Sequence, residues 1–67
     1  MLSSNIKKLR KRKQLSQEKL ARLADISYNT IVKIESGKAN NPTFDTLSKL
    51  ADVLNVSIDR LVGRRRK

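Results

Sequence analysis

The chain has 67 residues, with sixteen Lys and Arg against six Asp and Glu, so its formal net charge at pH 7 is +10. This length supports one small domain with a modest core. Histidine and cysteine are both absent, which excludes disulfides and the usual zinc ligands and argues against an enzyme. We expect no metal and no cofactor.

The basic residues are unevenly distributed along the chain. Six lie in residues 7–13 and four in residues 64–67, whereas the acidic residues are scattered singly. Such an excess suits a polyanion, because neutralising phosphates releases condensed counterions. Simple solubility and an anionic membrane surface are the alternatives. No apolar signal region or bilayer-spanning run is visible, so we expect a cytoplasmic protein and no membrane partner.

Apolar residues recur at helical spacing, and no segment alternates as a strand would. The first helix is predicted over residues 3–13, with Leu2, Ile6 and Leu9 on one face. Ser16 is a suitable N-cap for a second helix that begins at residue 17. Its predicted inward face consists of Leu20, Leu23 and Ala24.

A tight turn then leads to a third helix that Ser27 caps. Asp25 is predicted at the left-handed position of the turn, a conformation that Asp tolerates better than most residues but less well than glycine. Ile31 and Ile34 face inward, and the helix is expected to stop at Ser36 because Gly37 supplies a left-handed residue.

Residues 37–42 form a polar loop, and Thr43 caps a fourth helix that Asn55 closes. The predicted inward residues of this helix are Phe44, Leu47, Leu50, Ala51 and Leu54. Ser57 caps a short fifth helix that ends at Gly63, with Ile58, Leu61 and Val62 as its apolar set. The predicted domain spans residues 1–63, and residues 64–67 form a basic tail.

This pattern resembles the helix-turn-helix domains of the lambdoid phage repressor, Cro and Xre type. The resemblance rests on IKKLRKRKQLSQEKLA at 6–21, SYNTIVKIESGK at 27–38, Pro42, and LSKLADVLNVSIDRLV at 47–62. It implies an all-α fold, a compact five-helix lambda-repressor-like DNA-binding domain whose third helix lies in the major groove.

The resemblance also implies site residues. The expected base readers are Tyr28, Asn29 and Lys33, with Asn29 suited to adenine and Lys33 to guanine. The expected contacts to the DNA backbone or to base edges are Gln17, Ser27, Thr30, Ser36, Lys38, Asn40, Asn41 and Thr43. Arg10 and Glu35 occupy positions that form a structural ion pair in similar domains.

Val56, Ile58 and Leu61 offer a dimer patch, although this patch could equally be buried within the monomer. Arg60 lies among them and would repel its symmetry mate. We therefore expect a monomer or weak homodimer in solution, completed on a palindromic operator.

The function implied is a sequence-specific double-stranded DNA-binding transcriptional regulator, acting as a repressor, with no small-molecule ligand. The alternative is the antitoxin of a toxin–antitoxin pair, which would bind a toxin protein and its own operator. Co-purification with a small toxic partner would distinguish the antitoxin.

Overall fold

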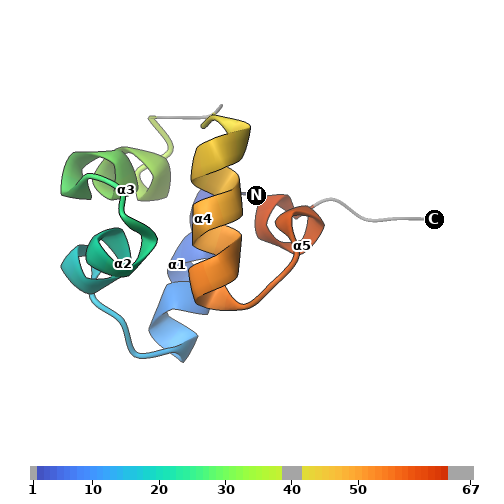
Figure 1. The fold of residues 1–67 in the computed structure, drawn as a ribbon, viewed down its shortest axis with the longest axis horizontal. Coiled ribbons are helices and arrows are strands. Elements are labelled where there is room, and N and C mark those ends of the chain that lie inside the picture. The colour runs from blue at the N-terminus through green and yellow to red at the C-terminus, as the bar shows by residue number, and fades with distance from the viewer. Residues whose placement is uncertain (1, 39–41, 64–67) are drawn as a thin grey trace.

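A computed structural model of the chain describes residues 2–38 and 42–63. The described residues form five helices and no strand, which confirms the all-α prediction. The helices are α1 (Leu2–Arg12), α2 (Gln17–Ala24), α3 (Tyr28–Glu35), α4 (Phe44–Leu54) and α5 (Ile58–Val62). In Figure 1, α4 runs between the α2–α3 pair on one side and α5 on the other, with α1 behind it. No helix in the described ranges is long and apolar enough to cross a membrane.

The predicted N-caps are present at four helices. Ser16, Ser27, Thr43 and Ser57 each adopt an extended backbone, and each side chain accepts a hydrogen bond from the N–H three residues later. These bonds satisfy amides that the first helical turn leaves without a backbone partner. Local sequence therefore sets where α2 to α5 begin.

Left-handed residues end several of the helices. Asp25 (φ 57°) follows α2 and Asn55 (φ 59°) follows α4, as the sequence predicted. Gln14 also adopts φ 59°, and α1 ends at Arg12, one residue before the predicted end. An L-residue in this region places its Cβ close to the following carbonyl oxygen, and Gln tolerates that less well than Asp or Asn.

We expect Asp25→Gly to raise the free energy of unfolding by at most about 1 kcal/mol, because glycine removes the Cβ clash but is more flexible in the unfolded chain. Gln14→Gly should give the larger gain of the two. Thermal unfolding followed by circular dichroism measures both. Lys8→Gly, at an exposed position in the middle of α1, is the control and should lower stability by about 1 kcal/mol. A loss of stability in Asp25→Gly would contradict the strain argument.

One hydrophobic cluster holds the helices together. Its fully buried members come from all five helices and are Ile6, Leu20, Ile31, Ile34, Leu50, Leu54 and Leu61. Ala21 and Ala24 of α2 are also buried, and α2 packs against both α3 and α4. A hydrogen bond of 3.3 Å from the Asn5 side-chain amide to the Leu61 carbonyl also joins α1 to α5.

Two residues predicted to face inward are exposed, so those predictions were wrong. Leu23 is 51% exposed, because the buried arc of α2 is centred on Ala24 and Leu23 lies about 100° around the helix from it. Phe44 is 73% exposed. It lies in the first turn of α4, which projects past the α2 and α5 helices that pack against the later turns (Figure 1).

The predicted dimer patch is largely used within the monomer. Leu61 is fully buried, so its assignment to a dimer surface was wrong. Val56 and Ile58 are half-buried and pack against the same hydrophobic cluster. The physical reason is the shortness of α5, whose few apolar residues are needed to attach it to α1 and α4.

Candidate nucleic-acid interface

The turn between α2 and α3 fixes how the two helices cross. The amide of Ile26 donates to the Ala21 carbonyl at 2.9 Å, and the amide of Asp25 donates to the Arg22 carbonyl at 3.2 Å. These bonds satisfy carbonyls at the end of α2 and turn the chain sharply. Ser27 then caps α3 directly after this turn, so the start of α3 is fixed relative to the end of α2.

Helix α3 has a buried side and an exposed side. Ile31 and Ile34 are buried in the cluster. Asn29 and Lys33 are exposed and lie one turn apart on the opposite side. Tyr28, at the start of the helix, is 49% exposed. The structure therefore brings the three predicted base readers to the outside of one helix.

These three side chains are free to meet a partner. No hydrogen bond or ion pair joins the side chain of Tyr28, Asn29 or Lys33 to another described residue. Glu35 is the only acidic residue in α3, and it is buried. The exposed side of α3 therefore presents an amide, a phenol and a cation, without a carboxylate to repel a polyanion.

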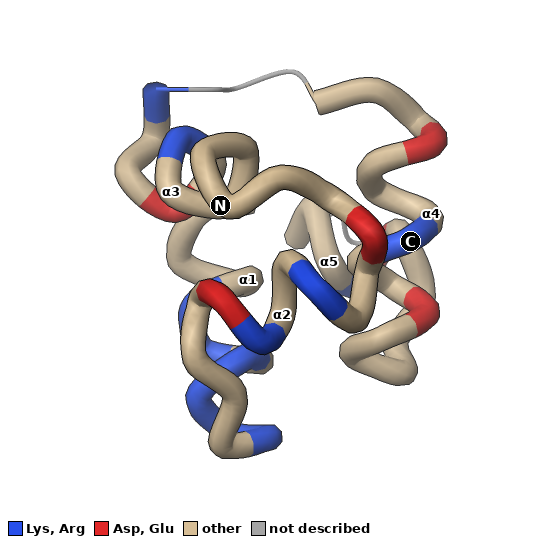
Figure 2. The backbone as a smooth tube through the Cα atoms, turned by 60° about the vertical axis from the view of Figure 1, so that its left-hand side comes forward, with Lys and Arg blue, Asp and Glu red and all other residues tan. Residues whose placement is uncertain are grey.

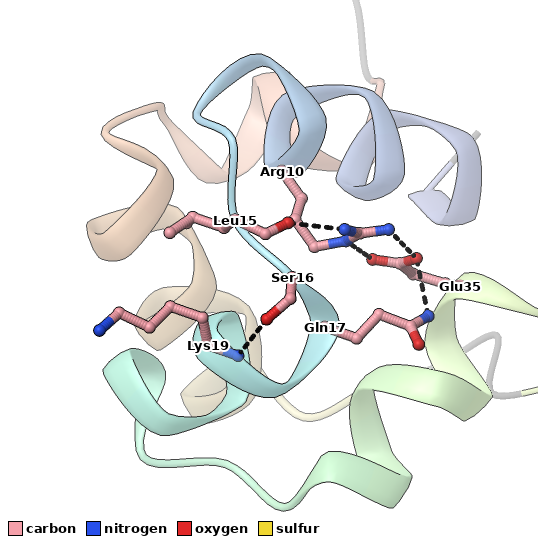
Figure 3. A network of polar contacts seen from close by, with 6 residues as sticks. All are labelled: Arg10, Leu15, Ser16, Gln17, Lys19 and Glu35. Atoms are coloured by element: carbon pink, nitrogen blue, oxygen red, sulfur yellow. Dashed lines mark hydrogen bonds and ion pairs between the residues drawn. The ribbon is translucent and has the colours of Figure 1, made fainter.

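Arg10 and Glu35 form an ion pair that ties α1 to α3. The Arg10 Nε donates to Glu35 Oε2 at 2.7 Å, and Nη2 donates to Oε1 at 3.0 Å, in the paired geometry of guanidinium and carboxylate. The remaining Arg10 Nη1 donates to the Leu15 carbonyl at 2.7 Å. The side chains are only 11% and 2% exposed, respectively. Figure 3 shows the pair between the helices.

Gln17 joins this pair from the start of α2. Its Nε2 donates to Glu35 Oε1 at 3.0 Å, so three helices meet at one carboxylate (Figure 3). Gln17 was predicted to contact DNA phosphate, but in the structure its amide nitrogen lies against Glu35. The backbone of the first turn of α2 still presents N–H groups that helices use for phosphates. No local sequence pattern indicates this internal bond, because it joins residues 18 positions apart.

The network holds Glu35 ionised. Burial raises the pKa of Glu35, but the hydrogen bonds from Arg10 and Gln17, together with the charges of Arg10 and Lys7, outweigh burial and hold the pKa below its ordinary value. The hydrogen bond with Glu35 in turn raises the pKa of Arg10 against the opposing effect of burial. The carboxylate therefore remains charged and paired at neutral pH.

The predicted hydroxyl contacts are engaged in helix caps. Ser27 Oγ accepts from the Thr30 amide at 3.1 Å and lies 2.8 Å from the Thr30 hydroxyl. Ser36 Oγ donates to the Lys33 carbonyl at 3.0 Å. Thr43 Oγ1 donates to the Thr46 hydroxyl at 3.0 Å. A phosphate contact that takes the hydroxyl proton of Ser36 or Thr43 would break one of these bonds.

Lys38 lies beside the C-terminal end of α3. Its amide donates to the Lys33 carbonyl at 3.0 Å, and its side chain is exposed. The segment after α3 therefore adds a second cation, Lys38, at the end of the helix where Lys33 also lies. Asn40 and Asn41, predicted to belong to the same phosphate clamp, lie outside the described residues, as does the basic segment 64–67.

Basic residues also follow α1. Lys7, Lys8, Lys11 and Arg12 are exposed, and α1 contains no acidic residue. Figure 2 shows Lys and Arg positions gathered along α1, with further ones on α2. No ion pair joins the four to another described residue. These exposed cations of α1 raise the positive electrostatic potential around α2 and α3.

The chain is similar to known proteins over most of its length. A helix-turn-helix family model matches residues 6–61. The HTH-type transcriptional regulator RghRB of Bacillus subtilis is 40% identical over 58 residues, which are 87% of this chain and 42% of that protein. Control protein C.SmaI of Serratia marcescens is 35% identical over 65 residues, or 97% of this chain and 76% of that protein.

A solved structure shares the fold. The crystal structure of SinR, the master regulator for biofilm formation, in complex with DNA superposes with a TM-score of 0.89 at 34% identity, covering 92% of this chain and 98% of that one. The chain spans 42% to 63% of the length of the Bacillus subtilis and Rickettsia regulators that it matches. The matched family model covers residues 6–61, which include all of α2, α3 and α4 and most of α1 and α5, and the chain therefore belongs to the helix-turn-helix family.

Proposed function

We propose that the chain is the sequence-specific double-stranded DNA-binding domain of a transcriptional regulator, acting as a repressor. The observation that carries the proposal is the exposed, carboxylate-free side of α3, held by the Arg10–Glu35–Gln17 network and by the α2–α3 turn. A helix of these dimensions enters the major groove. The relatives support the proposal, because they include transcriptional regulators and a structure of SinR with DNA.

The proposed base readers act through complementary hydrogen bonding. The Asn29 amide can donate to and accept from the N6 and N7 edge of adenine, and the Lys33 ammonium can donate to the O6 and N7 acceptors of guanine. Tyr28 adds a hydroxyl contact or packs against a thymine methyl group. These contacts carry the sequence preference.

Contacts to phosphate set affinity and orientation. We assign these to the amides at the start of α2 and to Lys38, with Lys7 and Lys11 of α1 adding positive potential. Ser27, Ser36 and Thr43 cap helices and the Thr30 hydroxyl bonds to that of Ser27, so these four hydroxyls already have internal partners.

One α3 helix reads only a few base pairs, so we propose that two copies bind a palindromic operator. Because Leu61 is buried, the predicted dimer patch is reduced to the exposed edges of Val56 and Ile58. Such a small apolar area supports a weak dimer that forms on the DNA. The antitoxin alternative gains no support from the relatives, whose names describe regulators.

The proposal is tested by selecting from a randomised duplex library at about 150 mM salt, where phosphate-only binding is weak. We expect enrichment of a palindrome whose half-sites lie about 10–10.5 base pairs apart. If the chain binds DNA without enriching any sequence, and this binding is lost as the salt concentration rises, sequence-specific recognition is contradicted. The binding then depends on net charge alone.

A further inference from the structure

Val32 is an apolar residue on the exposed side of α3. With Asn29, Lys33 and Ser36, it follows the spacing i, i+3, i+4, i+7 that marks one face of a helix. It is half-buried, yet among the described residues it belongs neither to the hydrophobic cluster nor to the side chains that pack against that cluster. The core of the domain therefore does not explain why an aliphatic side chain stands here.

Valine is also a poor choice for a half-buried helical position that does not pack against the core. It forms helices less readily than alanine or the long polar residues, because its branched Cβ crowds the preceding turn. The same branching leaves one strongly preferred χ1 rotamer in a helix. Two methyl groups are thus held in a defined direction on the face that carries Asn29 and Lys33.

A rigid apolar contact matches one feature of the major groove. The C5-methyl group of thymine is the apolar group that the base edges present there, and 5-methylcytosine presents the same group. We propose that Val32 is a specificity-determining residue whose methyl groups contact the C5-methyl of a pyrimidine beside the bases read by Asn29 and Lys33. This inference rests on the proposed function, and thymine is the expected source of the methyl group.

The test removes the methyl group from the DNA and the side chain from the protein, separately and together. Each thymine of the selected operator is replaced by deoxyuridine, and the Kd is measured for the wild-type chain and for Val32→Ala. At one thymine position of the half-site, we expect deoxyuridine to weaken wild-type binding about fourfold, the effect of burying one methyl group. Val32→Ala should show a clearly smaller difference between the two duplexes at that position than the wild type does.

A second set of duplexes distinguishes the two sources of the methyl group. Each cytosine of the half-site is replaced by 5-methylcytosine. In one outcome, 5-methylcytosine tightens binding by the wild-type chain but not by Val32→Ala, and deoxyuridine has no effect at any thymine position. This outcome would support the methyl contact and assign it to 5-methylcytosine.

Val62→Ala on α5 is the matched control. Val62 is likewise half-buried and outside the packed cluster, and this variant should discriminate thymine from deoxyuridine as the wild type does. Thermal unfolding checks the fold, and Val32→Ala should melt no lower than the wild type. A marked drop in its Tm would overturn the inference by assigning Val32 to the core.

The two proposals fail in different ways. A selected operator that binds the wild-type chain equally with every deoxyuridine and 5-methylcytosine substitution overturns the role of Val32 alone. A methyl effect that persists unchanged in Val32→Ala overturns it as well. Failure to enrich any operator overturns sequence-specific binding, and the inference about Val32 falls with it.

Discussion

Glu35→Ala is expected to lower the free energy of unfolding by about 3–5 kcal/mol, because removing one partner of a buried ion pair leaves the other charge buried and unpaired. The Arg10 guanidinium would lose two hydrogen bonds, and Gln17 would lose the acceptor of its amide. Domains of this size have a total stability of only about 3–10 kcal/mol. We therefore expect a largely unfolded chain at 37 °C, measured by thermal and urea unfolding.

Two variants show whether burial causes this loss. Lys49→Ala breaks the exposed pair of Lys49 with Asp45, whose N–O distance is 3.3 Å, and should change stability by about 0.5 kcal/mol or less. The double variant Arg10→Met with Glu35→Leu removes both charges and should recover most of the stability lost in Glu35→Ala. Equal losses in Glu35→Ala and Lys49→Ala would contradict the structural role of the buried pair.

The same network predicts how the stability of the fold changes as the pH falls. Because the pKa of Glu35 is lowered in the folded chain, its contribution is fully present above the ordinary glutamate pKa of about 4.3 and is lost as the pH falls through the lowered value. The double variant lacks this contribution, so its Tm should fall less steeply than that of the wild type below about pH 4.3. Parallel Tm curves for the two proteins would contradict the pairing of Glu35.

Asn29→Ala and Lys33→Ala are expected to weaken binding to the selected operator by about tenfold to a hundredfold each, the discrimination carried by one good side-chain contact to a base. Both residues are exposed and without a described internal partner, so the fold should be unaffected. Selection from the randomised library with each variant should also relax the preference at the contacted base pair. Kd values for the operator and for a scrambled duplex measure the two effects separately.

Lys8→Ala is the matched control for Lys33→Ala, since it removes the same charge from the exposed side of α1. It should weaken the operator and the scrambled duplex by the same factor, because a cation distant from the bases contributes through phosphate or potential alone. If Lys33→Ala also weakens both duplexes equally, Lys33 contacts phosphate and does not read a base.

Short-range signals in the sequence were sufficient to place the helices. Ser16, Ser27, Thr43 and Ser57 cap the helices that follow them, and Asp25 and Asn55 adopt the predicted left-handed conformation. A cap bonds to an amide three residues away, and a left-handed residue lies directly after the helix that it ends. Such interactions depend on neighbours in the chain, so the sequence contains all the information they require.

The packing of the helices decided the rest. Leu23, Phe44 and Leu61 are all apolar residues at helical spacing, yet the first two are exposed and the third is buried. Their burial depends on which helix lies beside each turn. The contact of Gln17 with Glu35 likewise requires α2 to lie against α3. Periodicity gives the direction of a side chain around its own helix, but only the placement of neighbouring helices determines what that side chain meets.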